Sequence, residues 1–466
     1  MRQQAEKKSF FSANSLNLLF RVVHFRYQTH QMNSRRDFLK KAGLTAGVLS
    51  LPGLFEPLLA SGFQNAVDRV NTMTPDQAAS DEDFWNWVKL QYTVNPSLIN
   101  LNNGGVSPQP KQVQDAHIRY YQYSNEGPSY YMWRELDKSR EPLRKRLAEL
   151  AGVDPEEVAI NRNSTEGLNS IIFGLNLKAG DEVVVSKQDY PNMLNAWKQR
   201  EKRDGIKLVW VNHELPSEDD AKLTKTYTDA FTDKTKIVHV THMINWTGQI
   251  LPVRKIADAA HAKGIEVICD SAHSFAHIQF KVTDLGCDYW ATSLHKWLCA
   301  PFGSGMMWIK KDKIKNVWSL LSNGEPDGND IRKFETLGTR SFASEMAISA
   351  AIDFHLLIGA ERKQARLQYL KNYWAEKVVK VPGFKLNTSL NPKYACAISN
   401  FIIEGFKPEE IDGKLLDKYR IHTVAINWEN IHGVRVTPSV YTSTADLDLL
   451  VKAITEIAAA GPPAGK

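Results

Sequence analysis

A short apolar run that ends in an acid is the feature that most constrains this chain. Residues 265–270 read IEVICD, and SAH follows directly. A β-branched, apolar run of this length predicts a buried strand. Its last residue, Asp270, would then lie at the carboxyl edge of a sheet, where α/β proteins bind their ligands. The run therefore predicts a buried sheet and marks Asp270 as a candidate site residue.

Strand-like and helix-like segments alternate through the middle of the chain. Helical periodicity is expected between the strands, for example over residues 141–150 and 253–263. Because a doubly wound sheet requires this alternation, we predict an α/β fold with a large, mostly parallel sheet. The expected strands cover residues 157–160, 182–186, 207–212, 236–241, 265–270, 289–292 and 305–309.

The pattern changes after residue 342. Helical spacing continues to about residue 377. Residues 395–404 and 433–437 then favour strands, and residues 445–458 favour a closing helix. This order predicts a smaller α+β region toward the C-terminus.

A lysine downstream of the acid narrows the chemistry. Lys296 lies 26 positions after Asp270, in the segment SLHK at residues 293–296. Pyridoxal 5'-phosphate needs both groups, because an ionised acid keeps its ring nitrogen protonated and a lysine holds its aldehyde as a Schiff base. Either residue alone has an ordinary explanation, since most such acids cap a turn and most lysines are solvated. Together they make Asp270 and Lys296 the candidate catalytic pair.

A phosphate site is expected at the start of an apolar helix. The segment NRNSTEGLN at residues 161–169 offers the hydroxyls of Ser164 and Thr165. A helix N-terminus presents unpaired N–H groups and a partial positive charge, so an anion can bind there. The alternative is that Ser164 only caps the helix.

Three motifs together resemble a known family. The segments DSAHSF at residues 270–275, ATSLHKWL at residues 291–298 and PFGSG at residues 301–305 resemble, in order and spacing, the class V aminotransferase group of fold-type I pyridoxal phosphate enzymes. Within that group the chain looks like the isopenicillin N epimerase-like branch, with cysteine desulfurases and kynureninases as cousins. The resemblance spans roughly residues 85–458 and implies a homodimer with shared active sites.

The resemblance also implies a domain division and a set of roles. Residues 106–345 would form the large cofactor domain and residues 346–460 the small C-terminal domain, on which residues 80–105 would pack. The roles carried over are phosphate contacts at Ser164, Thr165, Ser293 and His295, ring stacking by Tyr190, a hydrogen bond to the phenolic oxygen from Asn245 with His273 at the same edge, a contact from Thr339 to the neighbouring subunit's phosphate, the substrate carboxylate at Arg435, and a substrate-covering loop at Asn103.

The reaction expected is one on an amino acid. Lys296 would be the general base that takes the α-proton, and the site of reprotonation would decide the product. We expect an aminotransferase with a keto acid as acceptor. An amino-acid epimerase or racemase, or a C–S or C–N lyase, is the alternative on the same scaffold. A non-catalytic sugar or peptide binder is a third hypothesis, against which the intact Asp270, Lys296 and phosphate set argues.

The four cysteines indicate neither a metal site nor a desulfurase. No two of them form a C-x-x-C pair, so we expect no metal. An oxidising compartment would permit disulfides, which the sequence cannot pair, and buried free thiols are the favoured expectation. Cysteine desulfurases carry a nucleophilic cysteine shortly before the carboxylate-binding arginine. Residues 397–434 contain no cysteine, and Cys396 lies 39 positions before Arg435. Desulfurase activity is therefore not expected.

The positive charge of the chain belongs to its N-terminal leader. The formal net charge is +6, but residues 1–41 hold nine Lys or Arg and two acids, which leaves 49 basic and 50 acidic side chains elsewhere. The remainder therefore offers no electrostatic case for binding nucleic acid. The motif SRRDFLK at residues 34–40 predicts a twin-arginine signal in a leader of residues 1–65, with Met32 as an alternative start. A charged amphipathic helix is the other explanation. We expect the twin-arginine export machinery to deliver the protein to the periplasm.

Overall fold

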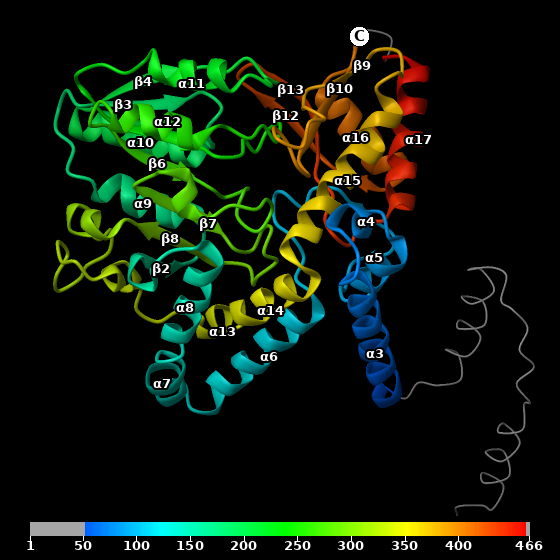
Figure 1. Ribbon diagram of the computed structural model, residues 1–466, viewed down its shortest axis with the longest axis horizontal. Helices are drawn as coiled ribbons and strands as arrows, with labels where there is room; N and C mark the ends of the chain where they lie inside the picture. The colour runs from blue at the N-terminus through cyan, green and yellow to red at the C-terminus, as the bar shows by residue number, and fades with distance from the viewer. Residues whose placement is uncertain (1–51, 463–466) are drawn as a thin grey trace, which may run out of the picture. The chain divides into compact units, whose positions relative to one another are not determined.

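A seven-stranded sheet lies at the centre of the larger domain, as the alternating sequence pattern predicts (Figure 1). The computed structural model describes residues 52–462. The strands run in the order β2-β8-β7-β6-β5-β3-β4, and β8 is antiparallel to both of its neighbours while the other pairs are parallel. The predicted α/β fold is confirmed. The strands are β2 (Val158–Asn161), β3 (Glu182–Ser186), β4 (Lys207–Val211), β5 (Thr235–Thr241), β6 (Glu266–Asp270), β7 (Tyr289–Ser293) and β8 (Gly305–Ile309).

Helices cover both faces of this sheet because its strands alternate their side chains between two cores. Val183 and Val185 pack with apolar residues of helices α9 and α10, whereas Val184 packs in the core that contains helix α12. All three valines are fully buried. A sheet covered on both faces needs such continuous apolar strands. The helices of this domain are α6 (Lys111–Glu126), α7 (Pro128–Tyr130), the π-helix η1 (Tyr131–Leu136), α8 (Arg140–Ala151), α9 (Ser164–Gly174), α10 (Pro191–Asp204), α11 (Asp220–Thr228), α12 (Val253–His261), α13 (Phe342–Met346) and α14 (Ile348–Ile358).

The strand register brings the carboxyl ends of three strands together. Thr241 of β5 pairs with Asp270 of β6, and Asp270 pairs with Ala291 of β7. The polar segments that follow these strands therefore begin side by side at one edge of the sheet.

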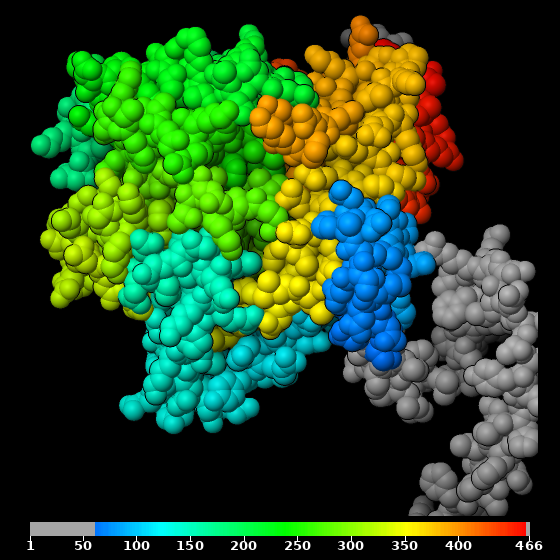
Figure 2. All heavy atoms as spheres, viewed as in Figure 1, coloured from blue at the N-terminus to red at the C-terminus, as the bar shows by residue number. Residues whose placement is uncertain are grey.

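The smaller domain is an antiparallel sheet covered by helices. Its strands run in the order β12-β13-β10-β9, and Figure 1 shows it beside the large sheet with helix α15 running along it. Figure 2 shows orange residues of the C-terminal part packed against the green middle of the chain, with most of the red C-terminal residues on the outer side. The expected strand at residues 395–404 is shorter than predicted, so Cys396 lies before it. The elements are α15 (Ala360–Val378), β9 (Phe384–Leu386), β10 (Ser399–Ile403), α16 (Pro408–Tyr419), β11 (Ile421–His422), β12 (Val424–Trp428), β13 (Ile431–Val436) and α17 (Thr444–Ala460).

Residues 80–105 contact the smaller domain. Lys89, at the end of helix α5 (Glu82–Lys89), lies 2.9 Å from Asp446. Strand β1 (Ile99–Asn100) pairs in parallel with β11. This segment therefore runs along the smaller domain before it reaches the carboxyl edge of the large sheet.

The N-terminal boundary predicted at residue 65 falls inside a helix. Helix α3 (Pro52–Val70) continues past it, with Val67 and Val70 buried in the core, and α4 (Pro75–Ala79) follows. The twin-arginine motif and the rest of residues 1–51 lie outside the described residues. Among residues 52–462, no single helix is long and apolar enough to cross a bilayer; the bent pair formed by residues 342–358 and α15 passes that test only when joined.

Candidate active site

A cavity of about 180 Å³ lies at the carboxyl edge of the large sheet. It brings together nine of the side chains that the sequence singled out, from five separate segments of the chain. They are Ser164, Thr165, Tyr190, Asn245, Asp270, His273, Ser293, His295 and Lys296.

Asp270 is a nearly buried carboxylate at the end of β6. It is 3% exposed, and its Oδ1 accepts a hydrogen bond from the Ala272 N–H at 2.9 Å. Burial raises the pKa of Asp270, while this N–H and the charge of Lys296 oppose the rise. A cation placed against the carboxylate would favour its ionised form further. The site is thus suited to hold a protonated ring nitrogen.

Lys296 is a buried lysine with a lowered pKa. Burial lowers the pKa to about 8, with Arg435 adding to the effect and Asp270 opposing it. Its Nζ lies 2.9 Å from His273 Nε2. A neutral amine is a nucleophile and a base, so this environment makes Lys296 reactive near neutral pH.

His273 is held in one tautomer by its neighbour. Trp297 Nε1–H donates to His273 Nδ1 at 3.4 Å, and burial, together with nearby cations, lowers the pKa of His273 well below its usual value. The neutral ring therefore carries its proton on Nε2 and donates it to Lys296 Nζ. His277 stacks on Trp297 at a centroid separation of 3.6 Å and accepts from the small-domain Ala397 N–H. The contact chain thus runs from the small domain to the lysine.

An anion site lies at the N-terminus of helix α9. Ser164 Oγ and Ser293 Oγ are 2.9 Å apart, and the Ser164 N–H donates to Ser293 Oγ. Asn163 caps the helix by accepting from the Glu166 N–H. The sequence alternative, in which Ser164 is the cap, is therefore wrong: Ser164 is the first helical residue and its hydroxyl faces the site.

Arg435 lies beside the cavity on β13. Its Nη1 donates to Asn245 O at 3.1 Å and its Nη2 to Asn102 Oδ1 at 2.8 Å, while Nε is buried without a partner among the described residues. Burial lowers its pKa to about 10, so the guanidinium stays charged at neutral pH. Within residues 52–462 no carboxylate pairs with Arg435, which leaves its charge for a bound anion.

Besides Arg435, two predicted residues do not line the cavity, Asn103 and Thr339. Asn103 is fully buried, its Nδ2 donates to Asn100 O and Thr437 O, and its Oδ1 accepts from Tyr441 Oη. It braces the loop, and the neighbouring Asn102 makes the contact with Arg435. Thr339 lies exposed on a separate loop.

Sequence reasoning did not single out four residues that line the cavity, among them Ala272. Thr241 ends β5 beside Asp270, and aligning the carboxyl ends of the predicted parallel strands would have found it. Asn163 and Gly105 also line it. No local signal marks Gly105, because its position depends on how the N-terminal segment folds back.

The residues present fit pyridoxal 5'-phosphate. Asn245 Oδ1 is buried without a partner among the described residues, at the edge of the cavity. Asp270 offers a carboxylate for the ring nitrogen, Lys296 an amine for the aldehyde, and the start of α9 an anion site. Within residues 52–462 no group of three or more His, Cys, Asp and Glu could hold a metal ion.

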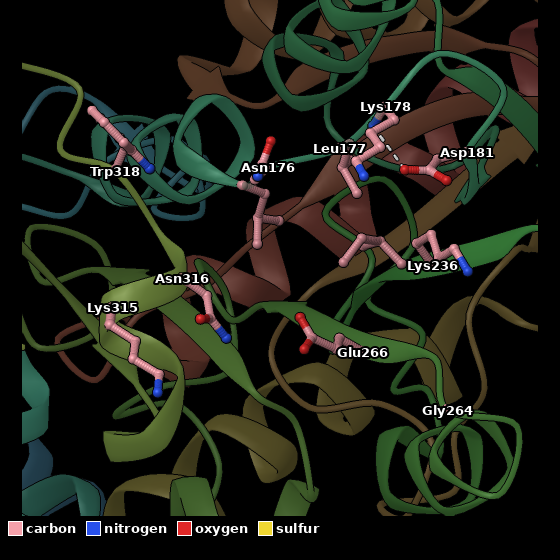
Figure 3. A pocket seen from close by; sticks show the side chains of 12 residues that line it. Asn176, Leu177, Lys178, Asp181, Lys236, Gly264, Glu266, Lys315, Asn316 and Trp318 are labelled. Atoms are coloured by element: carbon pink, nitrogen blue, oxygen red, sulfur yellow. Dashed lines mark hydrogen bonds between the residues drawn. The ribbon is translucent and has the colours of Figure 1, made fainter. Parts of the chain in front are cut away.

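A larger cavity, of about 650 Å³, lies at the opposite edge of the sheet (Figure 3). It is lined by Lys236 and Glu266, from the amino-terminal ends of β5 and β6. Its acids are already engaged, since Asp181 accepts from the Lys178 N–H and Glu266 from Lys313 and Tyr289. This cavity contains neither Lys296 nor Asp270, and the carboxyl ends of the strands lie at the other edge, so we do not place the chemistry there.

Comparisons with known proteins identify the family of this chain. A sequence model of the family described as aminotransferase class-V matches residues 99–450. The isopenicillin N epimerase of Streptomyces clavuligerus is 26% identical over 79% of this chain and 97% of its own length. A cysteine desulfurase of Haloferax volcanii is 30% identical over 62% of this chain and 71% of its own length. A solved structure of a C-DES mutant, with glycine covalently linked to its pyridoxal phosphate cofactor, superposes with a TM-score of 0.71 at 20% identity, over 79% of this chain and 99% of that one.

Proposed function

Because this chain belongs to the class-V aminotransferase family and its cofactor is pyridoxal 5'-phosphate, we propose that it is an aminotransferase acting on an α-amino acid. When bound, the cofactor accepts the amino group and the electron pair left at Cα, and returns both to a keto acid in the second half of the cycle. The observation that carries the proposal is the buried Lys296, whose pKa is lowered to about 8, at the same cavity as Asp270 and beside an arginine that pairs with no carboxylate among the described residues.

Lys296 is proposed to move the proton. Its lowered pKa lets Nζ take the α-proton at neutral pH, and the His273 Nε2–H orients its lone pair. Transamination requires one base that removes a proton at Cα and returns it to the cofactor on the same face. Lys296 supplies such a base.

Arg435 is proposed to hold the substrate carboxylate. The substrate carboxylate would accept a hydrogen bond from Arg435 Nε, which has no partner among the described residues. Asn102 would fix the plane of the guanidinium by accepting from Nη2. This contact would orient the α-hydrogen toward Lys296.

Desulfurase chemistry is not proposed, because a thiol is missing from the site. Cys269, Cys287, Cys299 and Cys396 are all buried, and none lines the cavity. Burial raises the pKa of Cys396 to about 12, so its thiol stays protonated. A desulfurase needs a thiolate that reaches the substrate sulfur.

Epimerisation is the second candidate. It needs a proton donor on the face opposite Lys296, and Tyr190, which lines the cavity and is 39% exposed, offers a hydroxyl. The similarity to an isopenicillin N epimerase over nearly the whole length of that protein also supports it. Elimination by a C–S or C–N lyase would use the same Lys296.

One experiment separates these reactions. The holoenzyme is incubated in D2O with single L-amino acids and no keto acid acceptor. An aminotransferase forms one equivalent of keto acid per active site and then stops until an acceptor is added. An epimerase forms the deuterated D-isomer, and a lyase releases ammonia and keto acid continuously. Absence of all three products, with no visible cofactor band, would contradict the proposal.

We also propose that the protein is an exported homodimer. Exposed apolar side chains at Ile118, Tyr121, Tyr130 and Trp133 along α6, α7 and η1 would be covered by a second copy. Light scattering should give the mass of a dimer.

Replacing both arginines of the SRRDFLK motif by lysine should keep the protein in the cytoplasm, as measured by cell fractionation.

A further inference from the structure

A second cavity, of about 430 Å³, lies directly behind the wall of the active site. It is formed between residues 93–108 and the start of α17, with His422 and Tyr441 on the small-domain side. Its volume is in the range of about 300–1,000 Å³ that small-molecule sites occupy. We call it the N-terminal groove.

The wall between the groove and the active site is one short turn. Gly105 lines both cavities. The Ser107 N–H donates to His295 O, which fixes the turn to the loop that carries Lys296. Asn102 lines the groove and accepts from Arg435. The groove therefore begins where the substrate carboxylate is expected to bind.

Gly105 is the residue that both cavities share, and it adds no side chain to the wall between them. A Cβ at this position would meet its nearest neighbours, atoms of Asn102, at 3.5 Å, so the fold itself does not require glycine here. The backbone is outside the left-handed region as well. An absent side chain at this point leaves room for a ligand to cross.

The groove is apolar and electrically balanced. Its lining includes Val94, Pro96, Leu98, Ile99, Val106 and Pro108. Its charged groups pair with each other, since Lys89 Nζ lies 2.9 Å from Asp446. Asn100 Nδ2 lies within hydrogen-bond distance of Asn103 Oδ1 and Tyr441 Oη. A charged side chain would find no unpaired counter-ion here, whereas methylene groups would be removed from water.

We infer that the N-terminal groove binds the side chain of the substrate, and that the substrate is an α-amino acid with a long, uncharged, largely apolar side chain. This inference rests on the proposed function. With the carboxylate on Arg435 and Cα at Lys296, such a side chain passes over Gly105 into the groove. Short amino acids react at the same centre without using it.

The test compares long and short substrates in the holoenzyme. The rate of change of the cofactor absorption band is measured against concentration for L-2-aminooctanoate, L-alanine and L-glutamate. Each methylene buried in the groove should raise kcat/KM about fourfold. We expect L-2-aminooctanoate to exceed L-alanine by at least about a hundredfold, and L-glutamate to gain nothing from its length.

A variant pair locates the effect. Val106 is 46% exposed and lines the groove but not the active-site cavity. Val106→Trp should lower kcat/KM for L-2-aminooctanoate at least tenfold and leave that for L-alanine within twofold. Val379→Trp is the matched control, because Val379 is 41% exposed and lies on α15's C-terminal cap, away from the groove. It should change neither value.

The outcomes separate the inference from the function on which it rests. If the long and short substrates react equally well and Val106→Trp is silent, the groove assignment is wrong while the enzyme remains one acting on amino acids. If no amino acid alters the cofactor band, the proposed function itself fails. Calorimetric titration of L-2-aminooctanoate into Lys296→Ala gives a readout free of turnover, in which adding Val106→Trp should weaken binding at least tenfold.

Discussion

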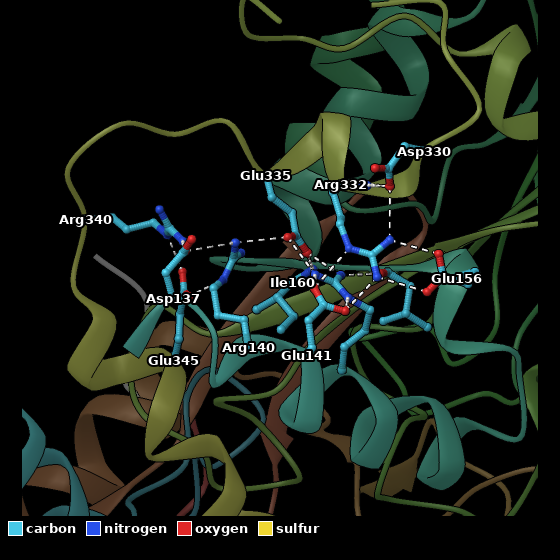
Figure 4. Close-up of polar contacts among 12 residues, drawn as sticks. Asp137, Arg140, Glu141, Glu156, Ile160, Asp330, Arg332, Glu335, Arg340 and Glu345 are labelled. Atoms are coloured by element: carbon cyan, nitrogen blue, oxygen red, sulfur yellow. Dashed lines mark hydrogen bonds and ion pairs between the residues drawn. The ribbon is translucent and has the colours of Figure 1, made fainter. Parts of the chain in front are cut away.

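Two clusters of buried charge in the molecule are built in opposite ways. Around Glu335 every charge has partners: Glu335 lies 2.5 Å from Arg144 and 3.0 Å from Arg140, and also accepts from the Ile160 N–H at 2.7 Å (Figure 4). Around Lys296 the charges are sparse. Lys296 has a neutral histidine as its neighbour, and Arg435 donates to two amide oxygens and to no carboxylate among the described residues.

The pKa values reflect this difference. In the Glu335 cluster, burial lowers the pKa of Arg144, but the bonds to Glu335 and Glu141 outweigh it and the net pKa is raised. Arg332, bridging Glu156 and Glu141, holds the pKa of Glu141 at about 2. In the active site, burial prevails and the pKa of Lys296 falls to about 8. Paired charge stabilises a fold, while unpaired charge is available for binding and catalysis.

The largest expected effect comes from removing the lysine. Lys296→Ala should lower turnover by about a thousandfold or more, because general-base catalysis alone contributes about 10²–10⁴. The free energy of unfolding should not fall much, since the buried amine that is lost makes no ion pair at contact distance and its one hydrogen bond is to His273. Steady-state kinetics measure the turnover, and denaturant unfolding measures the free energy of unfolding. Lys263→Ala, at an exposed lysine, is the control, and turnover retained in Lys296→Ala would sink the proposed role.

A substitution in the Glu335 cluster should lower stability and leave the cofactor site intact. Glu335→Gln removes the negative charge that pairs with the buried guanidiniums of Arg144 and Arg140. The free energy of unfolding should therefore fall by about 3 kcal/mol. The cofactor band should remain. Glu156→Gln removes an exposed partner of Arg332 and should cost less than about 1 kcal/mol. Equal losses in the two variants would remove the contrast between buried and exposed pairs.

The pH dependence of cofactor uptake sharpens the comparison. Only neutral Lys296 attacks the aldehyde, so the rate of uptake by apoprotein should rise about tenfold per pH unit below its pKa and level off above about 8. An ordinary lysine would level off near 10.5. Asp270→Asn should move the midpoint down, because the carboxylate favours the charged amine. Stopped-flow absorbance gives the midpoint, and a rise that continues beyond pH 10 would mean that burial does not control this lysine.

The smallest effect concerns the tautomer of His273. Trp297→Phe removes the donor to His273 Nδ1, so the neutral ring can carry its proton on Nδ1 instead. His273 Nε2 can then accept a hydrogen bond from the Lys296 ammonium and stabilise it. The uptake midpoint should then rise by about 0.4–1 pH unit, which corresponds to one hydrogen bond. Trp290→Phe is matched, since Trp290 is equally buried and its Nε1 has no partner among the described residues. Identical shifts in both variants would show a packing effect instead.

The large sheet was predictable because its signals are local. The seven strands expected from apolar runs all form, with ends that move by a residue or two. The small-domain strands β9 and β12 were not predicted. Both are only partly buried, so they lack the continuous apolar run on which the prediction depends.

The sequence by itself determined which residues end the central strands, and so placed Asp270 and, by motif, Lys296 at one edge of a parallel sheet. A two-residue period and a terminal acid are properties of a short segment, and burial follows from them. Only the tertiary structure decided which partners those residues meet. Arg144 and Glu335 are 191 positions apart, and the choice of Asn102 over Asn103 as the neighbour of Arg435 depends on how a distant segment folds back. Such contacts depend on packing between segments far apart in the chain, which no local pattern encodes.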